Sequence, residues 1–122
     1  MGVIMSKIQV SANIQVPRGG LEEFKQYAAE CLKQVKEKDT ETTQYDWFIN
    51  ADNTECEIRE TYDNSEAVLR HQSNVHEALV ALFNKFGGPS SLTIYGDPSP
   101  ELLQYVKVSG LEIKIFTLLQ GL

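Results

Sequence analysis

The sequence contains no basic cluster and no long apolar segment, and both absences limit what the protein can do. Lys and Arg number 11 against 17 Asp and Glu, which gives a net charge of −6 and an isoelectric point near 4.9. Nucleic acids and anionic membranes attract basic surfaces, so neither is an expected partner. The longest apolar run, Ala78–Phe83, is far too short to cross a bilayer. No apolar signal segment follows the N-terminus, and we expect a cytoplasmic protein.

Cysteine is scarce, and the two cysteines do not form a redox or metal-binding motif. Cys31 lies in an apolar pattern of helical spacing, and Cys56 lies in one of strand spacing. Two buried free thiols are therefore favoured over a disulfide, which is the alternative.

The spacings that bind metals and nucleotides are also missing. His71 and His76 are five positions apart, so on a helix their side chains would point about 140° away from each other. His76–Glu77 lacks the second histidine of H-E-x-x-H, and no G-x-G-x-x-G, P-loop or G-x-S-x-G motif occurs. We therefore expect no metal and no organic cofactor, so that any enzyme activity must work without flavin or NAD.

The hydrophobic periodicity predicts an α+β protein that forms a single domain over residues 1–122. The predicted elements, in chain order, are a strand over Lys7–Val16, a helix over Leu21–Lys38, a hairpin, helical segments over Ser65–Gln72 and from Asn74 to about Phe86, a strand over Leu92–Tyr95, a helix that begins at Ser99–Pro100 and a strand over Leu111–Leu118. A capping box formed by Asn74 and Glu77 suggests that the second helical segment restarts there. The order is that of a ferredoxin-like split βαβ sandwich with an antiparallel sheet, extended by a C-terminal helix and strand.

The hairpin is the most informative part of the chain. Alternating strand-favouring residues lie on both sides of a turn at Asp52–Asn53. If Ala51 pairs with Thr54, the register places Tyr45 opposite Glu60, Trp47 opposite Ile58 and Ile49 opposite Cys56. On the other face Asp46 then lies opposite Arg59, where we expect a cross-strand ion pair.

Several motifs in and after the hairpin resemble the antibiotic-biosynthesis-monooxygenase (ABM) domain family. They are Gln44–Phe48 (QYDWF), Glu60–Tyr62 (ETY), Ser65–Ala67 followed by His71, and Tyr95–Leu102, which is similar to the tail of some small members. The resemblance implies a homodimer in which two sheets meet to form an α+β barrel with the helices outside. It also implies direct oxygenation of an electron-rich phenol or quinol, with the substrate supplying the electrons.

His71 and Glu60 are the candidate catalytic residues. On the predicted helix His71 shares a stripe with Val68 and Val75 that faces the core, toward the hairpin face that carries Glu60. His71 is interpreted as a general base or a hydrogen-bond donor to a ligand. A half-buried carboxylate such as Glu60 should have a raised pKa unless Arg or His pairs with it. Glu60 would then orient His71, act as base itself, or form a purely structural pair with His71. The alternative is a core histidine whose polar atoms are satisfied by Glu60 or by a backbone carbonyl.

The candidate substrate-binding residues are Tyr45, Trp47, Tyr62 and Asn13. The three aromatic residues share one hairpin face, where they form either a core cluster or the wall of a pocket for a flat aromatic ligand. Asn13 lies in the first strand, at a position where some relatives of the ABM family place a functional asparagine. We leave open which face of the sheet the Asn13 side chain lies on, because polar and apolar residues alternate along this strand.

Two functions are compatible with these features. The first is a cofactor-independent monooxygenase that acts on a small aromatic or quinol-type molecule. The second is a dimeric protein of the same fold that binds a small ligand, or serves a structural role, without catalysis. A cavity beneath the second helical region would favour the enzyme, and a filled interior would favour the second function.

Overall fold

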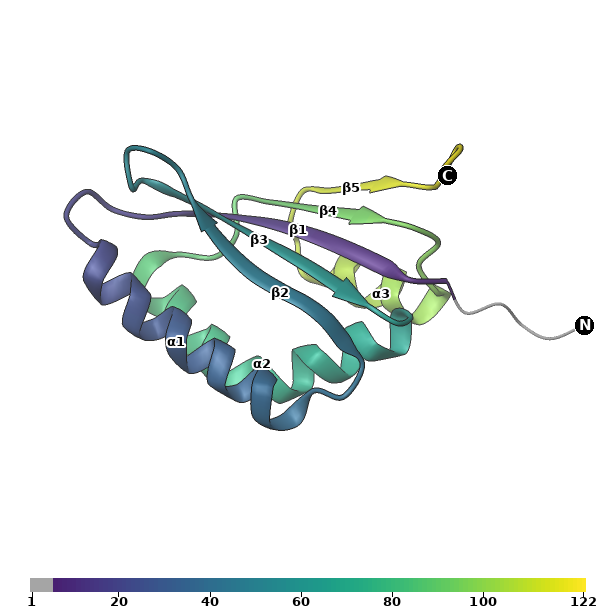
Figure 1. The fold of residues 1–122 in the computed structure, drawn as a ribbon, viewed down its shortest axis with the longest axis horizontal. Helices are drawn as coiled ribbons and strands as arrows, with labels where there is room; N and C mark the ends of the chain where they lie inside the picture. Colours follow the sequence, from purple (N-terminus) through teal and green to yellow (C-terminus); the bar gives the residue numbers. More distant parts are fainter. Residues whose placement is uncertain (1–5) are drawn as a thin grey trace, which may run out of the picture.

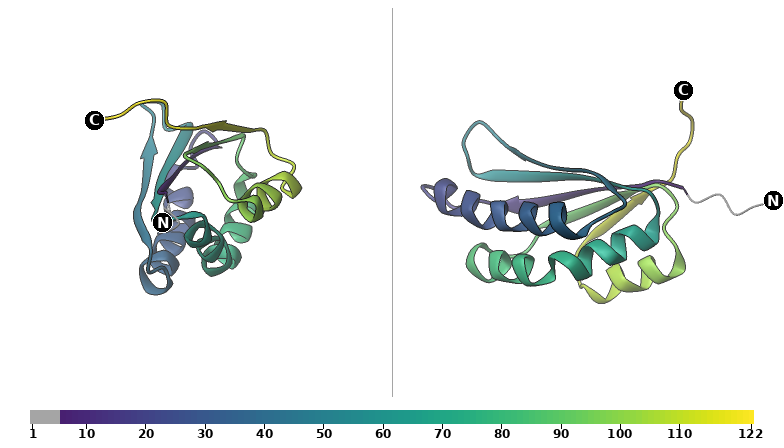
Figure 2. Two further views of the ribbon diagram at one scale, coloured as in Figure 1. Left: turned by 90° about the vertical axis from the view of Figure 1, so that its right-hand side faces the viewer. Right: turned by 60° about the horizontal axis from the view of Figure 1, so that its bottom comes forward.

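A computed structural model describes residues 6–122 and shows helices and strands in two layers (Figure 1). The elements are β1 (Ile8–Gln15), α1 (Leu21–Lys38), β2 (Thr42–Ile49), β3 (Glu55–Tyr62), α2 (Ser65–Phe86), β4 (Ser91–Tyr95), α3 (Pro100–Val108) and β5 (Ile113–Phe116). The helices of this part of the chain all cover the same face of the sheet (Figure 2). The first five residues of the predicted domain lie outside the described range.

The sheet has five strands in the order β2-β3-β1-β4-β5. The first four strands pair antiparallel, as in the ferredoxin-like split βαβ unit. β5 pairs in parallel with β4, and α3 forms the crossover that this parallel pairing requires. The structure therefore confirms the predicted α+β class, the ferredoxin-like unit and its C-terminal extension.

The register of the hairpin is confirmed. Tyr45 pairs with Glu60, and the neighbouring pairs follow as predicted. Asn53 adopts a φ of 60° in the turn, a left-handed conformation that asparagine tolerates well. Asp46 and Arg59 are in register, but the expected ion pair between them is not formed in the described part of the chain. Asp46 instead accepts a hydrogen bond of 3.1 Å from Gln44. Exposed charges gain little from pairing, because water screens them.

Two predicted boundaries are wrong. Ser65–Phe86 is a single continuous helix, capped by the side chain of Asn64, and it does not restart at Asn74. The side chain of Asn74 is not a helix cap because it donates a hydrogen bond of 2.9 Å to Asp39 instead. The last strand is also shorter than predicted, and the exposed Leu118 lies beyond its end.

The core lies between the sheet and the helices, in two clusters that are joined by Leu92. The stripe predicted for α2 is buried as expected, from Val68 through His71 to Leu82. Cys31 and Cys56 are both buried free thiols, which confirms that prediction. No helix in the described range combines the length and apolarity needed to cross a membrane.

Candidate functional site

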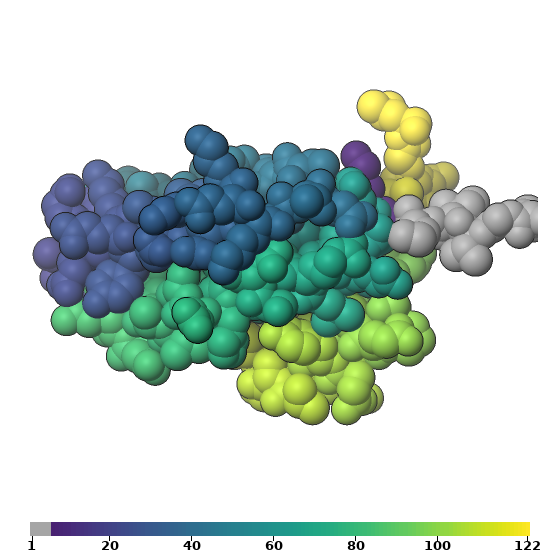
Figure 3. All heavy atoms as spheres, turned by 90° about the horizontal axis from the view of Figure 1, so that it is seen from below, coloured from purple at the N-terminus to yellow at the C-terminus, as the bar shows by residue number. Residues whose placement is uncertain are grey.

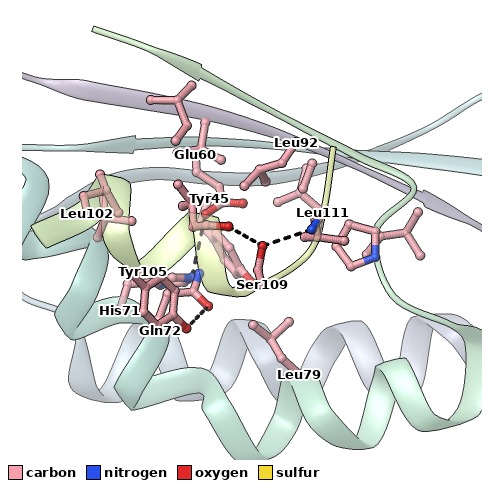
Figure 4. Close-up of a pocket in the computed structure, with 18 of the residues that line it drawn as sticks. Tyr45, Glu60, His71, Gln72, Leu79, Leu92, Leu102, Tyr105, Ser109 and Leu111 are labelled. Carbon is pink, nitrogen blue, oxygen red and sulfur yellow. Dashed lines mark hydrogen bonds and ion pairs between the residues drawn. The ribbon is translucent and has the colours of Figure 1, made fainter. Parts of the chain in front are cut away.

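A cavity of about 200 Å³ lies between the sheet, α2 and α3. Its walls come from β1, β2, β3 and β4 on one side and from both helices on the other, and the loop that follows α3 closes one end (Figure 4). Most of the lining is aliphatic, with Ala12, Ile14, Leu79 and Leu102 as examples. An engineered protein cavity of about 150 Å³ binds benzene, so this one has room for a small aromatic molecule.

Polar side chains from three different strands and helices meet in one part of the cavity wall. They are Tyr45 on β2, Glu60 on β3 and His71 on α2 (Figure 4). The Tyr45 and His71 rings pack edge to face with centroids 4.9 Å apart. His71 Nε2 lies 3.8 Å from Glu60 Oε1. His71 is 1% exposed and Glu60 is 7% exposed, so neither group is solvated by bulk water.

The other ring nitrogen of His71 contacts a residue that the sequence did not single out. His71 Nδ1 lies 2.7 Å from Asp39 Oδ2. Asp39 follows α1, in the loop that leads to β2, and it also accepts hydrogen bonds of 2.6 Å from Thr42 and 2.9 Å from Asn74. The imidazole ring therefore lies between two carboxylates, Asp39 on one side and Glu60 on the other.

The two carboxyl groups have different environments, and their pKa values move in opposite directions. Burial acts to raise the pKa of Asp39, but the hydrogen bonds from His71, Thr42 and Asn74 outweigh it and lower that pKa. For Glu60, burial dominates and raises the pKa against the opposing effects of His71 and Tyr62. The pKa of Asp39 is therefore pushed below, and that of Glu60 above, the ordinary range of a carboxyl group, and such a separation of two carboxyl groups is typical of acid–base sites.

The two tyrosines of the site both have raised pKa values, and one of them, Tyr62, is a hydrogen-bond donor. Burial, followed by the charge of Glu60, raises the pKa of Tyr45 and of Tyr62 well above the usual range. Tyr62 is fully buried and donates its hydroxyl hydrogen to Glu60 Oε1. Its ring lies against His71, with centroids 5.2 Å apart. Tyr62 thus holds Glu60 in place from behind the cavity wall.

The structure places the remaining predicted site residues elsewhere. Trp47 does not line the cavity, since it packs between the rings of Phe24 and Tyr45 at centroid distances of 5.9 and 5.8 Å. Asn13 lies on the opposite face of the sheet, where its amide donates a hydrogen bond of 2.6 Å to Glu55. The expectation that Asn13 shapes the pocket is therefore corrected: its neighbours Ala12 and Ile14 face the cavity instead.

Several polar groups of the site were not predicted. Gln72, Tyr105 and Ser109 all line the cavity, and the Tyr105 hydroxyl is 3.5 Å from the Gln72 side-chain oxygen (Figure 4). Tyr105 and Ser109 belong to the C-terminal extension, whose position over the sheet depends on tertiary packing. The only signal that could have found Asp39 is its place in a short polar loop directly before the hairpin.

Within residues 6–122 no group of three His, Cys, Asp or Glu side chains is placed to hold a metal ion. The expectation that the protein carries neither a metal nor an organic cofactor stays a prediction.

Comparisons with known proteins support the fold. No family model and no curated protein matches the chain. The solved structure of MupZ from Pseudomonas fluorescens is 19% identical, covers 100% of this chain and 92% of its own, and has a TM-score of 0.78. A protein from Caulobacter crescentus, provisionally described as an antibiotic biosynthesis monooxygenase, is 18% identical over 75% of this chain and 87% of its own, with a TM-score of 0.63.

A similarly described protein from Nitrosomonas europaea is 14% identical over 82% of this chain and 98% of its own, with a TM-score of 0.62. At these identities the likeness concerns architecture. The chain has the ABM-like ferredoxin-like fold that its motifs predict, while its activity has to be argued from the site.

Proposed function

We propose that the protein is a small cofactor-independent enzyme of the quinol-monooxygenase type, which binds an uncharged hydroxylated aromatic molecule in the cavity and takes up its hydroxyl proton. The observation that carries this proposal is the position of His71 and Glu60. They lie side by side, almost fully buried, in the wall of a cavity whose lining is otherwise largely apolar. Buried ionisable groups that face an open cavity are typical of catalytic sites.

The charge of the cavity supports an uncharged ligand. Of the described residues that line it, none is Lys or Arg, and Glu60 supplies a carboxyl group. Asp39 adds a second carboxyl group directly behind His71. A carboxylate or phosphate on the ligand would lose its hydration without gaining a cationic partner, which is costly in an apolar site. A neutral phenol or quinol has a hydroxyl for the polar wall and a ring for the apolar one.

The proposed chemistry begins with proton transfer. His71 and Glu60 accept the hydroxyl proton in a site shielded from water, and the resulting electron-rich anion is able to reduce O₂. In the overall balance a phenol loses its hydroxyl hydrogen and one ring hydrogen, gains one oxygen atom and becomes a quinone, while the second oxygen atom leaves as water. The site geometry supports the proton transfer, and the likeness to proteins described as monooxygenases supports the oxygenation.

A matched pair of ligands tests the binding part of this proposal. Calorimetric titration should show that 2-naphthol binds at least about tenfold more tightly than 2-naphthoate, which has the same rings and an anionic group. His71→Asn should weaken 2-naphthol binding about tenfold or more, because the polar wall loses its base. His76→Asn, a change at an exposed position of the same helix, is the control and should bind as the unaltered protein does. A preference for 2-naphthoate, or equal 2-naphthol affinity in both variants, would contradict the proposal.

Oxygen consumption tests the catalytic part. With dihydroxynaphthalenes as substrates, each O₂ consumed should give one hydroxynaphthoquinone and one water without hydrogen peroxide, and His71→Asn should abolish the excess over spontaneous oxidation. Binding without any such excess for the whole panel would contradict the monooxygenase and favour a ligand-binding protein.

A further inference from the structure

The two nitrogens of His71 face different parts of the molecule. Nε2 faces Glu60 and the apolar cavity, whereas Nδ1 faces Asp39. On the Asp39 side there is a small surface cleft of about 30 Å³, whose rim includes the ion pair between Arg70 and Glu41. His71 lines both the cavity and this cleft, so it separates the ligand space from the surface.

We propose that Asp39 is a positioning residue that keeps a proton on Nδ1 of His71, so that Nε2 is the nitrogen that exchanges a proton with the ligand. This inference rests on the proposed function, since it assigns the direction in which His71 acts. Within the loop before the hairpin, nothing in the sequence pattern distinguishes Asp39 from Glu41.

The hydrogen bonds of Asp39 support this role. Oδ1 accepts from Asn74, and Oδ2 accepts from Thr42 and lies 2.7 Å from Nδ1 of His71. His71 and Asn74 belong to α2, which is distant in sequence, whereas Thr42 lies three residues after Asp39 at the start of β2, so the carboxylate is held by both a local and a long-range contact. An ionised carboxylate can only accept hydrogen bonds, so at this distance the facing ring nitrogen must carry the hydrogen. In a neutral imidazole the lone pair then lies on Nε2, toward the cavity.

The groups around the His71 ring make its Asp39 side and its Glu60 side different. Asp39 lies beside the surface cleft and has three donors, whereas Glu60 lines the cavity and accepts a hydrogen bond from the Tyr62 hydroxyl. A proton received from a ligand is then held on Nε2, with Glu60 Oε1 3.8 Å away, while Asp39 balances the charge of the imidazolium. The same arrangement keeps the ring from turning over, because the opposite orientation would break the bond to Asp39.

Nuclear magnetic resonance of protein labelled with ¹⁵N in histidine tests the proposal directly. The sequence has two histidines, and the exposed His76 gives an internal reference in the same spectrum. In the unaltered protein His71 should carry a proton on Nδ1, either alone or together with one on Nε2. A ring protonated on Nε2 only would overturn the proposal without any variant being made.

Two variants test the cause. Asp39→Asn keeps the size of the side chain but offers an amide that can donate to Nδ1, so the neutral His71 ring should move its proton to Nε2. Asp46→Asn makes the same chemical change at an exposed position of β2 and should leave the His71 signals unchanged. A ring that keeps its Nδ1 proton in folded Asp39→Asn protein would also overturn the proposal.

Ligand binding separates this inference from the proposed function. If 2-naphthol binds the unaltered protein, Asp39→Asn should weaken its affinity about tenfold, and Asp46→Asn should not. Equal affinity in Asp39→Asn, with the tautomer inverted, would show that the ring orientation is irrelevant and would overturn the role given to Asp39. Failure of 2-naphthol to bind any form would contradict the proposed function, whereas the tautomer would still decide whether Asp39 controls His71.

Discussion

In the candidate site, burial acts to raise the pKa of Asp39, Tyr45, Glu60 and Tyr62 alike. The same desolvation that raises the pKa of Glu60 also keeps Tyr45 and Tyr62 neutral, and only Asp39 has enough donors to overcome it. The site is therefore a set of groups with separate roles, built from residue types that are ordinary in themselves. The effect of burial on pKa gives two predictions, one for the thiols of Cys31 and Cys56 and one for the carboxyl group of Glu60.

Both thiols should be inert in the folded protein. Burial raises the pKa of Cys31 to about 12 and that of Cys56 to about 11, and only the thiolate is a strong nucleophile. At pH 8 a disulfide reagent such as 5,5′-dithiobis(2-nitrobenzoate) should react slowly with the native protein and rapidly with two thiols after denaturation. Fast reaction of either thiol under native conditions would show that the core opens there.

Glu60 should make the protein less stable as the pH rises. Because its folded pKa is raised, the folded state holds a proton that the unfolded chain has already lost. The free energy of unfolding therefore falls as the pH rises from near the ordinary value of 4.5 through the raised pKa. Glu60→Gln removes this term, so urea unfolding should show its stability rising relative to the unaltered protein between acid and neutral pH. Glu57→Gln, on the same strand, controls for the loss of a carboxylate. If the unfolding free energy of Glu60→Gln had the same pH dependence as that of the unaltered protein, the raised pKa of Glu60 would be contradicted.

Some of these residues could be predicted and others could not. The inward position of His71 followed from the helical stripe, and that of Glu60 followed from the hairpin register. Asp39 could not be found in this way because it lies in a loop, where no periodicity tells which direction a side chain takes. The face on which the Asn13 side chain lies was open for a different reason, because only the position of the helices decides which face of the sheet is the inner one.

At the scale of elements, α2 and α3 determine the shape of the cavity. α2 brings His71 to the sheet, and α3 lies alongside α2 on the outer surface and closes the space next to it (Figure 3). Leu102 on α3 is fully buried and lines the cavity. The C-terminal extension of the ferredoxin-like unit is therefore part of the site rather than an appendage.

Leu102→Ala should show the part that α3 plays. Removing a fully buried leucine side chain costs about 2–5 kcal/mol of unfolding free energy, and here it also enlarges the cavity. Chemical denaturation should show that loss, while titration should show weaker binding of 2-naphthol and a relative gain for a three-ring phenol. Val108→Ala, at a 72% exposed position of the same helix, should change neither quantity measurably. An unchanged preference between the two ligands in Leu102→Ala would mean that α3 does not limit the cavity.

The order and type of the elements were predictable because strong periodicity marked each one. The continuity of α2 was not, since the pattern of Asn74 and Glu77 fits a helix start as well as a helix interior. Asn74 lies in the middle of α2, where its side chain donates a hydrogen bond to Asp39. This is a tertiary contact, which the local sequence does not predict. The position of α3 over the cavity is tertiary information of the same kind.

At the scale of the whole molecule, the sheet is covered on one face only (Figure 2). The two core clusters meet at Leu92, which supports the proposal that the chain is one domain. The free face carries polar side chains on its central strands and exposed aromatic side chains, Phe48 and Phe116, on its edge strands. A sheet of this kind is commonly covered by another layer. We propose that a second copy of the chain supplies it, through an interface of mixed polarity.

Light scattering at micromolar concentration should therefore give twice the chain mass of 13.7 kDa. Phe48→Asp, on the free face of the sheet, should shift the protein toward the single-chain mass because it adds a charge to the interface. Leu32→Asp, at an exposed position of α1, is the matched control on the helical side and should leave the mass unchanged. The single-chain mass for the unaltered protein would contradict the dimer.

The cavity should be a ligand site whose polar wall receives a phenol hydroxyl. A crystal structure of the protein soaked with 2-naphthol should therefore show the rings between α2, α3 and the sheet, with the hydroxyl oxygen at hydrogen-bond distance from His71 Nε2 or the Glu60 carboxyl group. A ligand bound elsewhere, or rings in the cavity with the hydroxyl directed away from both groups, would contradict it.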